Sequence, residues 1–113
     1  MQPPIVVTNQ GDVLVFGSTE DASRYLEPID VNNREYTAWD SQGWPLNLFV
    51  ESGRVRIEDR DGAAAKPDEL LLTLREFVKW CLKLRGVPDD WVPSATLEEL
   101  VKAAAELSAR RNN

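Results

Sequence analysis

The hydrophobic periodicity of this 113-residue chain changes once, at residues 61–67, and this change limits the folds that the chain can adopt. Before this segment, apolar residues alternate with polar ones as in β-strands, and after it they recur at the spacing of an α-helix. Residues 1–61 thus form a strand-rich half and residues 67–111 a helical half. Because neither half alone would bury enough apolar surface, we expect one α+β domain that spans residues 1–113.

The strand-rich half predicts an antiparallel sheet of about five strands. Residues 5–8 and 13–16 are short apolar runs that flank turn-forming residues, and together they predict a first hairpin. Farther along, the alternation of apolar and polar residues is regular, which predicts a meander with one solvent-exposed face. The remaining strands are expected at residues 35–40, 44–51 and 54–59.

Helix signals predict one short helix after the first hairpin and two helices at the end of the chain. Ser18 precedes acidic residues that suit a helix N-terminus, and Pro28 is expected to end this short helix. The apolar stripe over residues 68–85 predicts a long helix. Thr96 and Glu99 have the spacing of a capping box, which predicts the start of the last helix. We expect the two C-terminal helices to pack on one face of the sheet.

Net charge and the missing residue types narrow the class of function. The chain carries 19 acidic and 13 basic residues, a net charge of −6, which repels nucleic acid and favours a basic protein partner. It has no histidine and one cysteine, so it can build neither a usual zinc site nor a histidine-activated serine. No segment approaches the roughly 20 apolar residues that span a bilayer. We therefore expect a cytoplasmic protein that uses no metal and no cofactor and binds neither nucleic acid nor membrane.

The candidate catalytic groups are weak, and we predict that the chain is not an enzyme. Without histidine, acid–base chemistry would need two carboxyl groups across a cleft, one of them with a pKa raised by burial. Asp59 with Asp61, and Glu98 with Glu99, sit in turns or at helix starts, where acidic residues are favoured anyway. Cys81 falls on the apolar stripe of its helix and is expected to be a core residue, not a nucleophile.

Four tryptophans are a high number for a chain of this length. Trp80 and Trp91 are expected to fill the core. Trp39 and Phe49 are different, because each lies opposite in phase to the apolar face of its own strand, on a face that is otherwise polar. Two alternatives stay open for them. Either a helix or loop covers them, or they anchor a partner, because protein interfaces favour aromatic residues with a polar rim.

The first half of the chain also carries a pattern that spans several predicted elements. It consists of residues 11–22, Gly-Asp-Val-Leu-Val-Phe-Gly-Ser-Thr-Glu-Asp-Ala, followed by residues 25–27, 30–31 and 35–36 and by Asp40. This pattern resembles that of small bacterial immunity-type proteins of polymorphic toxin systems. The resemblance implies a small acidic protein that neutralises a cognate toxin, often a basic nuclease, by covering its active site. It does not extend to the helical half and assigns no binding residue.

We therefore hypothesise that the chain is a binding protein, namely an immunity protein that inhibits a toxin by stoichiometric occlusion. Acidic side chains would steer a basic toxin domain toward the chain, and aromatic ones would anchor it. The predicted contact residues are Glu35, Trp39, Asp40, Phe49, Glu51, Glu58 and Asp59. Two alternatives are a non-catalytic structural or regulatory adaptor that acts as a homodimer, and a small enzyme that uses only carboxylates.

Overall fold

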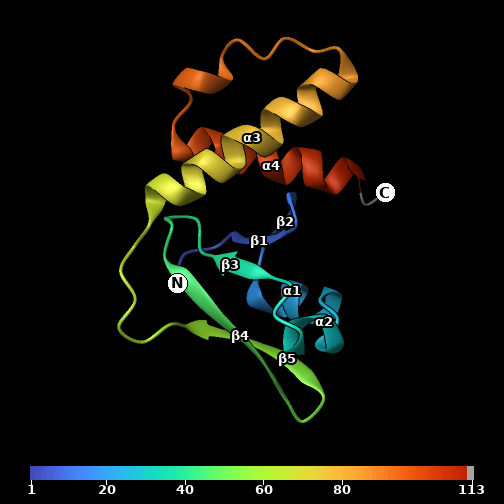
Figure 1. The fold of residues 1–113 in the computed structure, drawn as a ribbon, viewed down its shortest axis with the longest axis vertical. Helices are drawn as coiled ribbons and strands as arrows, with labels where there is room; N and C mark the ends of the chain where they lie inside the picture. Colours follow the sequence, from blue (N-terminus) through green and yellow to red (C-terminus); the bar gives the residue numbers. More distant parts are fainter. Residues whose placement is uncertain (112–113) are drawn as a thin grey trace.

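The chain folds around an antiparallel five-stranded sheet with the strand order β2-β1-β3-β4-β5 (Figure 1). The structure, a computed structural model, describes the backbone of residues 1–111 and the side chains of residues 1–108. The α+β class, the antiparallel sheet and the two C-terminal helices are confirmed. In chain order the elements are β1 (Ile5–Asn9), β2 (Asp12–Phe16), α1 (Thr19–Tyr25), α2 (Pro28–Asn32), β3 (Thr37–Trp39), β4 (Pro45–Glu51), β5 (Arg54–Asp59), α3 (Pro67–Arg85), the 3-10 helix η1 (Val92–Ser94) and α4 (Leu97–Arg111).

The first hairpin, β1–β2, has an internal strand that is buried on both faces. Its turn residues Gln10 and Gly11 have φ values of 50 and 88, and this left-handed pair matches the twist of a tight hairpin. Val6 and Val7 of β1 are both fully buried, and they point to opposite faces of the sheet. This double burial explains why β1 is apolar throughout and does not alternate.

Two short helices follow the first hairpin, where the sequence predicts only one. Ser18 caps α1, because its side-chain oxygen accepts a hydrogen bond from the Asp21 N–H at 3.1 Å. Pro28 was expected only to end this helix, but it also occupies the first turn of α2. Proline is tolerated there because N–H groups of the first turn have no hydrogen-bond partner within the helix. The second helix has five residues, too few for a periodic apolar pattern. Packing against the sheet therefore decides whether it forms.

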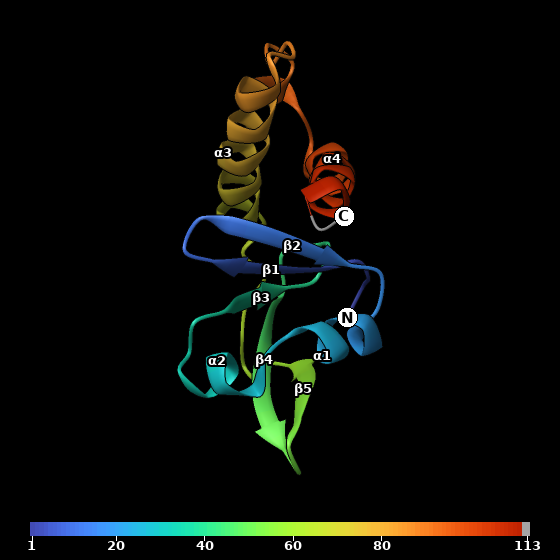
Figure 2. The same ribbon diagram turned by 90° about the vertical axis from the view of Figure 1, so that its right-hand side faces the viewer.

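The sheet separates two hydrophobic clusters, each covered by its own pair of helices. On one face α3 and α4 pack over Val6, Val13 and Trp39. The other face, which is covered by α1 and α2, buries Ile5, Val7, Ala38, Leu46 and Val55. Figure 2 shows the β1–β2 hairpin lying between these two helical layers. The helices at the C-terminus therefore share one face, as the sequence predicts.

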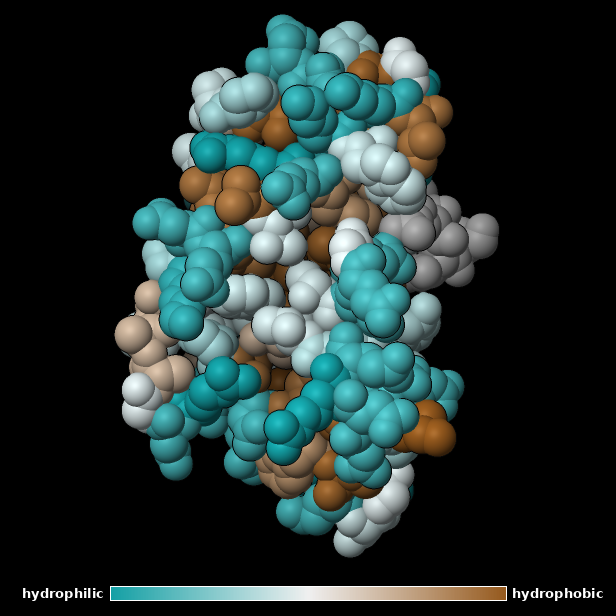
Figure 3. Space-filling view, viewed as in Figure 1, coloured by the Kyte–Doolittle hydropathy of each residue, from teal (hydrophilic) through white to brown (hydrophobic). Residues whose placement is uncertain are grey.

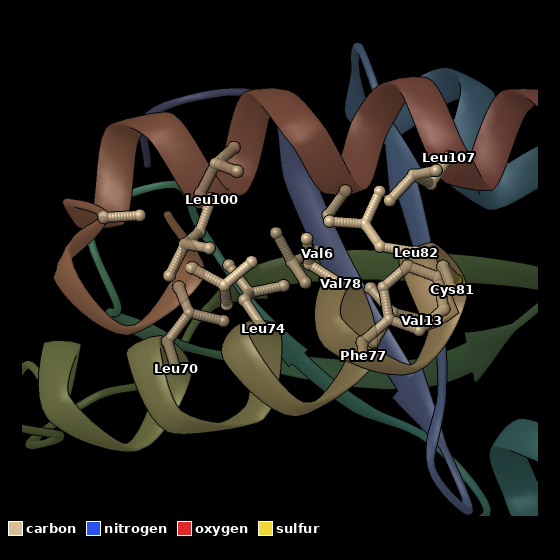
Figure 4. Close-up of a cluster of buried hydrophobic side chains, with 14 of the residues drawn as sticks. Val6, Val13, Leu70, Leu74, Phe77, Val78, Cys81, Leu82, Leu100 and Leu107 are labelled. Atoms are coloured by element: carbon tan, nitrogen blue, oxygen red, sulfur yellow. The ribbon is translucent and has the colours of Figure 1, made fainter. Parts of the chain in front are cut away.

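Helices α3 and α4 run in the same direction, because residues 86–96 return the chain along α3 before α4 begins (Figures 1 and 4). Leu70 and Leu74 of α3 face Leu100 of α4 at one end of the contact. All three side chains are fully buried. The broad apolar stripe of α3 thus contacts α4 and the sheet together, which is why it is wider than the seam between two helices alone.

The predicted capping box at the start of α4 is confirmed. The Glu99 N–H donates to the Thr96 hydroxyl oxygen at 3.2 Å, and the Thr96 N–H donates to Glu99 Oε1 at 3.0 Å. These hydrogen bonds satisfy two N–H groups that have no partner inside the helix. They also hold the pKa of the Glu99 carboxyl below its ordinary value, because the backbone and hydroxyl of Thr96 stabilise the charged form.

The prediction that Trp80 and Trp91 fill the core is wrong. Trp80 is 50% exposed and Trp91 is 39% exposed. Trp80 lies beside the apolar stripe of α3, and its neighbour Cys81 takes the core position, as predicted for that residue. Trp91 lies in the segment that returns from α3, just before Val92 enters the core. Smaller side chains therefore fill the space between α3 and α4.

Candidate functional site

The β4–β5 hairpin extends beyond its neighbour β3 and has one uncovered face (Figure 2). Helices α3 and α4 pack mainly over β2, at the opposite edge of the sheet. The hairpin residues that share the orientation of Trp39 therefore remain open to solvent on that side. We call this surface the open hairpin face, and its residues are Asn47, Phe49, Glu51, Arg54, Arg56 and Glu58.

Phe49 is the large apolar side chain of the open hairpin face, and it is half-buried. It lies directly opposite Arg56 in the register of β4 and β5. The guanidinium of Arg56 lies 3.9 Å from the carboxylate of Glu51, so a charged pair shares this face with the ring. An aromatic residue with a charged and polar rim is typical of surfaces that bind other proteins.

Three of the predicted acidic contact residues belong to the same hairpin and are exposed. Glu51 and Glu58 lie on the open hairpin face, and Asp59 ends β5, where its carboxylate lies 3.7 Å from the N-terminal amino group. Arg54 and Arg56 belong to β5, the strand that also contains Glu58 and Asp59. The face is therefore mixed in charge, whereas the contact predicted from the sequence contains only acidic and aromatic residues.

Glu35 lies apart from the hairpin, directly after α2, and is exposed. A hydrogen bond to the Asp30 side chain and the negative charge of Asp30 raise the pKa of Glu35. The hydroxyl of Tyr36 donates to Asp30 Oδ2 at 3.2 Å. Partial burial, followed by this bond to Asp30, raises the pKa of Tyr36. Glu35 thus belongs to a small acidic group at the end of α2.

Trp39 is buried, with 7% of its surface exposed, and does not line a contact surface. Its ring lies in the cluster beneath α3 and α4, which settles the alternative that the sequence left open for this residue. Its Nε1 atom has no hydrogen-bond partner within the described residues. Trp39 and Phe49 share a phase and a face, but only Trp39 lies beneath the C-terminal helices.

Asp40 is 1% exposed and therefore cannot contact a partner, contrary to the prediction. Its Oδ1 accepts hydrogen bonds from the N–H groups of Gln42 at 2.9 Å and Trp44 at 3.0 Å. Its Oδ2 accepts one from the Gln2 N–H at 3.0 Å. Asp40 thus shapes the turn between β3 and β4 and ties the N-terminal segment to it. The turn signal Asp-Ser-Gln-Gly was available in the sequence as a hint of this role.

A groove of about 600 Å³ lies between α2 and β4, and we call it the α2–β4 groove. Tyr36, Leu48 and Val50 form half-buried apolar parts of its wall. Arg34 and Arg60 are its charged lining residues. The sequence gives no sign that Arg34 and Arg60 lie in one groove, because they are 26 positions apart in the chain.

A second groove, of about 720 Å³, lies between α1 and the outer edge of β5. Three acidic and three basic side chains line this α1–β5 groove, so its charge is balanced. The hydroxyl of Ser23 donates to the carbonyl oxygen of Val55, which closes part of the β5 edge. The two flanks of the β4–β5 hairpin therefore differ, with a balanced groove on the β5 side and a basic one on the β4 side.

Helix α3 exposes a row of apolar side chains at its C-terminal end, which the sequence-based prediction did not include. Trp80 and Leu84 are one helical turn apart, Val87 follows Gly86 at the end of the helix, and Leu84 is 68% exposed. The row lies beside the broad core stripe, from which periodicity alone does not separate it. Figure 3 shows apolar and hydrophilic residues interspersed over the face in view, without one large continuous apolar surface.

The described side chains offer little for catalysis or metal binding. Residues 1–108 contain no group of three or more side chains that could hold a metal ion. Cys81 is buried at 4% exposure, and the acidic side chain with a raised pKa, Glu35, is exposed and not enclosed in a cleft. None of the described helices combines the length and the apolar character that a membrane crossing needs.

Comparison of the chain with protein-family models, with curated proteins and with solved structures finds no match in any of the three. No activity or partner of a relative therefore transfers to this chain. Its function has to be inferred from the geometry and charge of its own surfaces.

Proposed function

We propose that this chain is a non-catalytic binding protein that occludes a protein partner, and that the open hairpin face is its contact surface. The observation that carries the proposal is the half-buried ring of Phe49 on a part of the sheet that none of the described helices covers. Trp39 lies on the same face of the sheet but is buried, because α3 and α4 cover that part of the face. A ring left at the surface among charged groups suits the centre of an interface.

The partner that we propose is a basic toxin domain, which makes the chain an immunity protein. A net charge of −6 supports a basic partner, since opposite charge speeds encounter and disfavours wrong partners. Glu51, Glu58 and Asp59 of the hairpin would meet such a partner, and Glu35, which lies apart from them after α2, would add to the negative charge that attracts it. The resemblance of residues 11–40 to immunity-type proteins supports the same role. Trp39 and Asp40 are not part of the proposed contact, because both are buried.

The proposal predicts a toxin gene beside the gene of this chain, and co-expression in bacteria with the toxin domain encoded there tests it. The intact chain is expected to restore growth and to form a one-to-one complex with the toxin domain. Phe49→Asp is expected to weaken that complex at least about tenfold, because hot-spot aromatic residues contribute about 2 kcal/mol or more. The affinity is measured by titration calorimetry.

Leu72→Asp is the matched control, since Leu72 is an apolar residue of α3 that is 59% exposed and lies outside the hairpin. It introduces the same charge and is expected to preserve both growth and affinity. Glu51→Lys and Glu58→Lys form a second set of variants, which reverse a charge but keep the ring of Phe49. They should slow association with the basic partner. Growth that fails equally with both aspartate variants, or a native pull-down that returns only housekeeping proteins, would count against the proposal.

A homodimeric adaptor is a second candidate function, and the exposed row on α3 favours it. Trp80 and Leu84 lie one turn apart on α3, Val87 follows the end of the helix, and each of the three is at least 46% exposed. Light scattering after size-exclusion chromatography decides between the two. A dimer that persists on dilution and that Leu84→Glu converts to a monomer would support the adaptor, and a monomer at all concentrations would exclude it.

A further inference from the structure

The free edge of β4 carries unused backbone hydrogen-bonding groups. The Asp40 N–H donates to the Trp44 carbonyl oxygen at 2.9 Å, so Leu46, two residues farther along, also turns its backbone N–H and C=O groups toward β3, where it is in register with Ala38. Leu48 and Val50 have the same orientation, because the hydrogen-bonding direction alternates from one residue of a strand to the next. Since β3 begins at Thr37, no strand reaches them, and no backbone or side-chain hydrogen bond reaches them from this side within the described residues. An uncovered edge of this kind is a template for one more strand.

The α2–β4 groove lies along this edge and is basic, in a chain whose net charge is −6. Its charged lining residues are Arg34 and Arg60, and among residues 1–108 no ion pair joins either to an acidic group. The guanidinium of Arg60 reaches the carbonyl oxygen of Leu46 at 3.5 Å, which places it at the same edge of β4. Two arginines without acidic partners suit the binding of carboxylates.

The backbone of Arg34 gives an independent sign that its side chain has a function. Its N–H donates to the Val31 carbonyl at 3.0 Å, and the Glu35 N–H donates to the Asp30 carbonyl at 3.1 Å. These two bonds define a helix end at which glycine is usual, because the residue must adopt a left-handed conformation. Arg34 adopts it with a φ of 57. Arg34 therefore holds a long charged side chain at the groove in a conformation that costs backbone strain.

We propose that the α2–β4 groove binds an extended acidic peptide of another protein, which adds to the free edge of β4 as an extra strand. The backbone of the peptide pairs with Leu48 and Val50, and its carboxylates bind Arg34 and Arg60. This inference goes beyond the proposed toxin neutralisation because it needs no toxin, although Asn47 and Phe49 of the open hairpin face also line the groove.

The lining of the groove also defines the peptide. Side chains of an added strand point alternately to the two faces of the sheet. On one face they meet the half-buried Tyr36, Leu48 and Val50, which favours apolar residues at every second position. The tail of this chain, which contains Arg110 and Arg111, has the wrong charge for a basic groove. The occupant is therefore a segment of another protein in which acidic and apolar residues alternate.

Selection of random linear peptides displayed on phage against the full chain tests this proposal. We expect enrichment of peptides in which acidic and apolar residues alternate. A selected peptide should shift the amide resonances of Leu48 and Val50 in the ¹⁵N-labelled chain and slow their hydrogen exchange. Arg34→Gly and Arg60→Gln should each weaken binding at least about tenfold, since a hydrogen bond to a charged group contributes about 1.5 kcal/mol or more.

Arg24→Gln is the matched control, because Arg24 lines the α1–β5 groove and not the α2–β4 groove. It removes the same charge and should leave peptide affinity unchanged. The proposal is overturned if selection yields no binders, if peptide affinity is the same for wild type and Arg34→Gly, or if the shifted amides lie at Ile57 on the β5 edge. Protection of the Leu48 amide by self-association without peptide would make a second copy the occupant and overturn it too.

Discussion

Single residues decide how the turns of this chain meet the rest of the fold. Asp40 holds the turn between β3 and β4, and Gly43 in that turn has a φ of 88. The carbonyl oxygen of Gly43 also accepts a hydrogen bond from the Lys66 N–H at 2.8 Å. A Cβ on Gly43 would lie 2.6 Å from the Cα of Pro67. Glycine is needed at this position both for its conformation and for the close approach of the segment that starts α3.

Gly43→Ala should therefore destabilise the fold more than an alanine at another turn glycine. Gly53 is the control, since its φ is 77 but nothing lies within 4 Å of a Cβ placed there. We expect Gly53→Ala to cost about 1 kcal/mol from conformation alone, and Gly43→Ala to cost about 1–3 kcal/mol more from the contact. Urea denaturation measures both, and equal losses would show that the backbone at Pro67 moves aside freely.

Arg34→Gly should raise the stability of the chain while it removes a group of the α2–β4 groove. Glycine adopts the left-handed conformation without the strain of a side chain, and part of that gain is offset by the more flexible unfolded state. We expect a net gain of about 0.5–1 kcal/mol in the free energy of unfolding. The control is Asn33→Gly, which should destabilise because Asn33 has a φ of −83. A less stable Arg34→Gly variant would contradict the strain that we assign to Arg34.

At the scale of elements, the end of each helix is set by a different local device. Ser18 caps α1 through its side chain, and Gly86 closes α3 with a φ of 66. Helix α4 starts with the reciprocal bonds between Thr96 and Glu99. These devices use residues that are close in sequence, so each can be predicted without knowledge of contacts between distant elements.

The capping box of α4 predicts a dependence of stability on pH. Because the pKa of Glu99 in the folded chain lies below its ordinary value of 4.5, its stabilising effect is complete above that value. It is lost as the pH falls through 4.5 and then through the lower pKa of the folded state. Glu99→Gln should remove this part of the acid sensitivity, and Thr96→Ala should cost about 1 kcal/mol at neutral pH.

Urea midpoints measured at neutral and acidic pH check this prediction. Glu98→Gln is the control, because Glu98 lies in the same first turn but outside the capping box. It should keep the full acid sensitivity. An unchanged pH profile in Glu99→Gln would mean that the capping bonds do not persist in solution.

On the scale of the whole molecule, two hydrophobic clusters share one sheet. Val6 and Val7 are neighbours in β1, yet they belong to different clusters. The loss of either helical layer would therefore expose one face of the same strand. This shared strand couples the two layers, and we expect the chain to unfold as one cooperative unit.

Leu74→Ala and Leu46→Ala test this coupling from the two sides of the sheet. Both residues are at most 1% exposed, and each substitution should cost about 2–5 kcal/mol. In each variant, tryptophan fluorescence and far-UV circular dichroism should report the same urea midpoint. Leu84→Ala, at a site that is 68% exposed, should change stability by less than about 0.5 kcal/mol. Separate midpoints in either core variant would show that the layers unfold independently.

Much of the fold could be predicted from local signals, whereas the candidate site could be predicted only in part. The boundaries of β5 and the capping box of α4 match the prediction because alternation and capping involve nearby residues. Helix α2 was missed, because a helix of five residues is too short to show a periodic pattern of apolar residues. Trp80 was placed in the core because tryptophan side chains are well buried on average, although it lies outside the apolar stripe of its helix. Asp40 was taken for a surface acid, although its partners include Gln2, far away in the chain.

The sequence by itself determined the class of the fold, the strand-rich and helical halves and most element ends, since these depend on residues within one turn or one strand. Only the tertiary structure decided that Trp39 is covered and Phe49 is open, although both have the same phase in their strands. Only the structure showed that β3 stops short and leaves the edge of β4 beside Arg34 and Arg60. Coverage of a face and exposure of an edge depend on elements that meet across the whole chain, and no local pattern encodes where those elements stop.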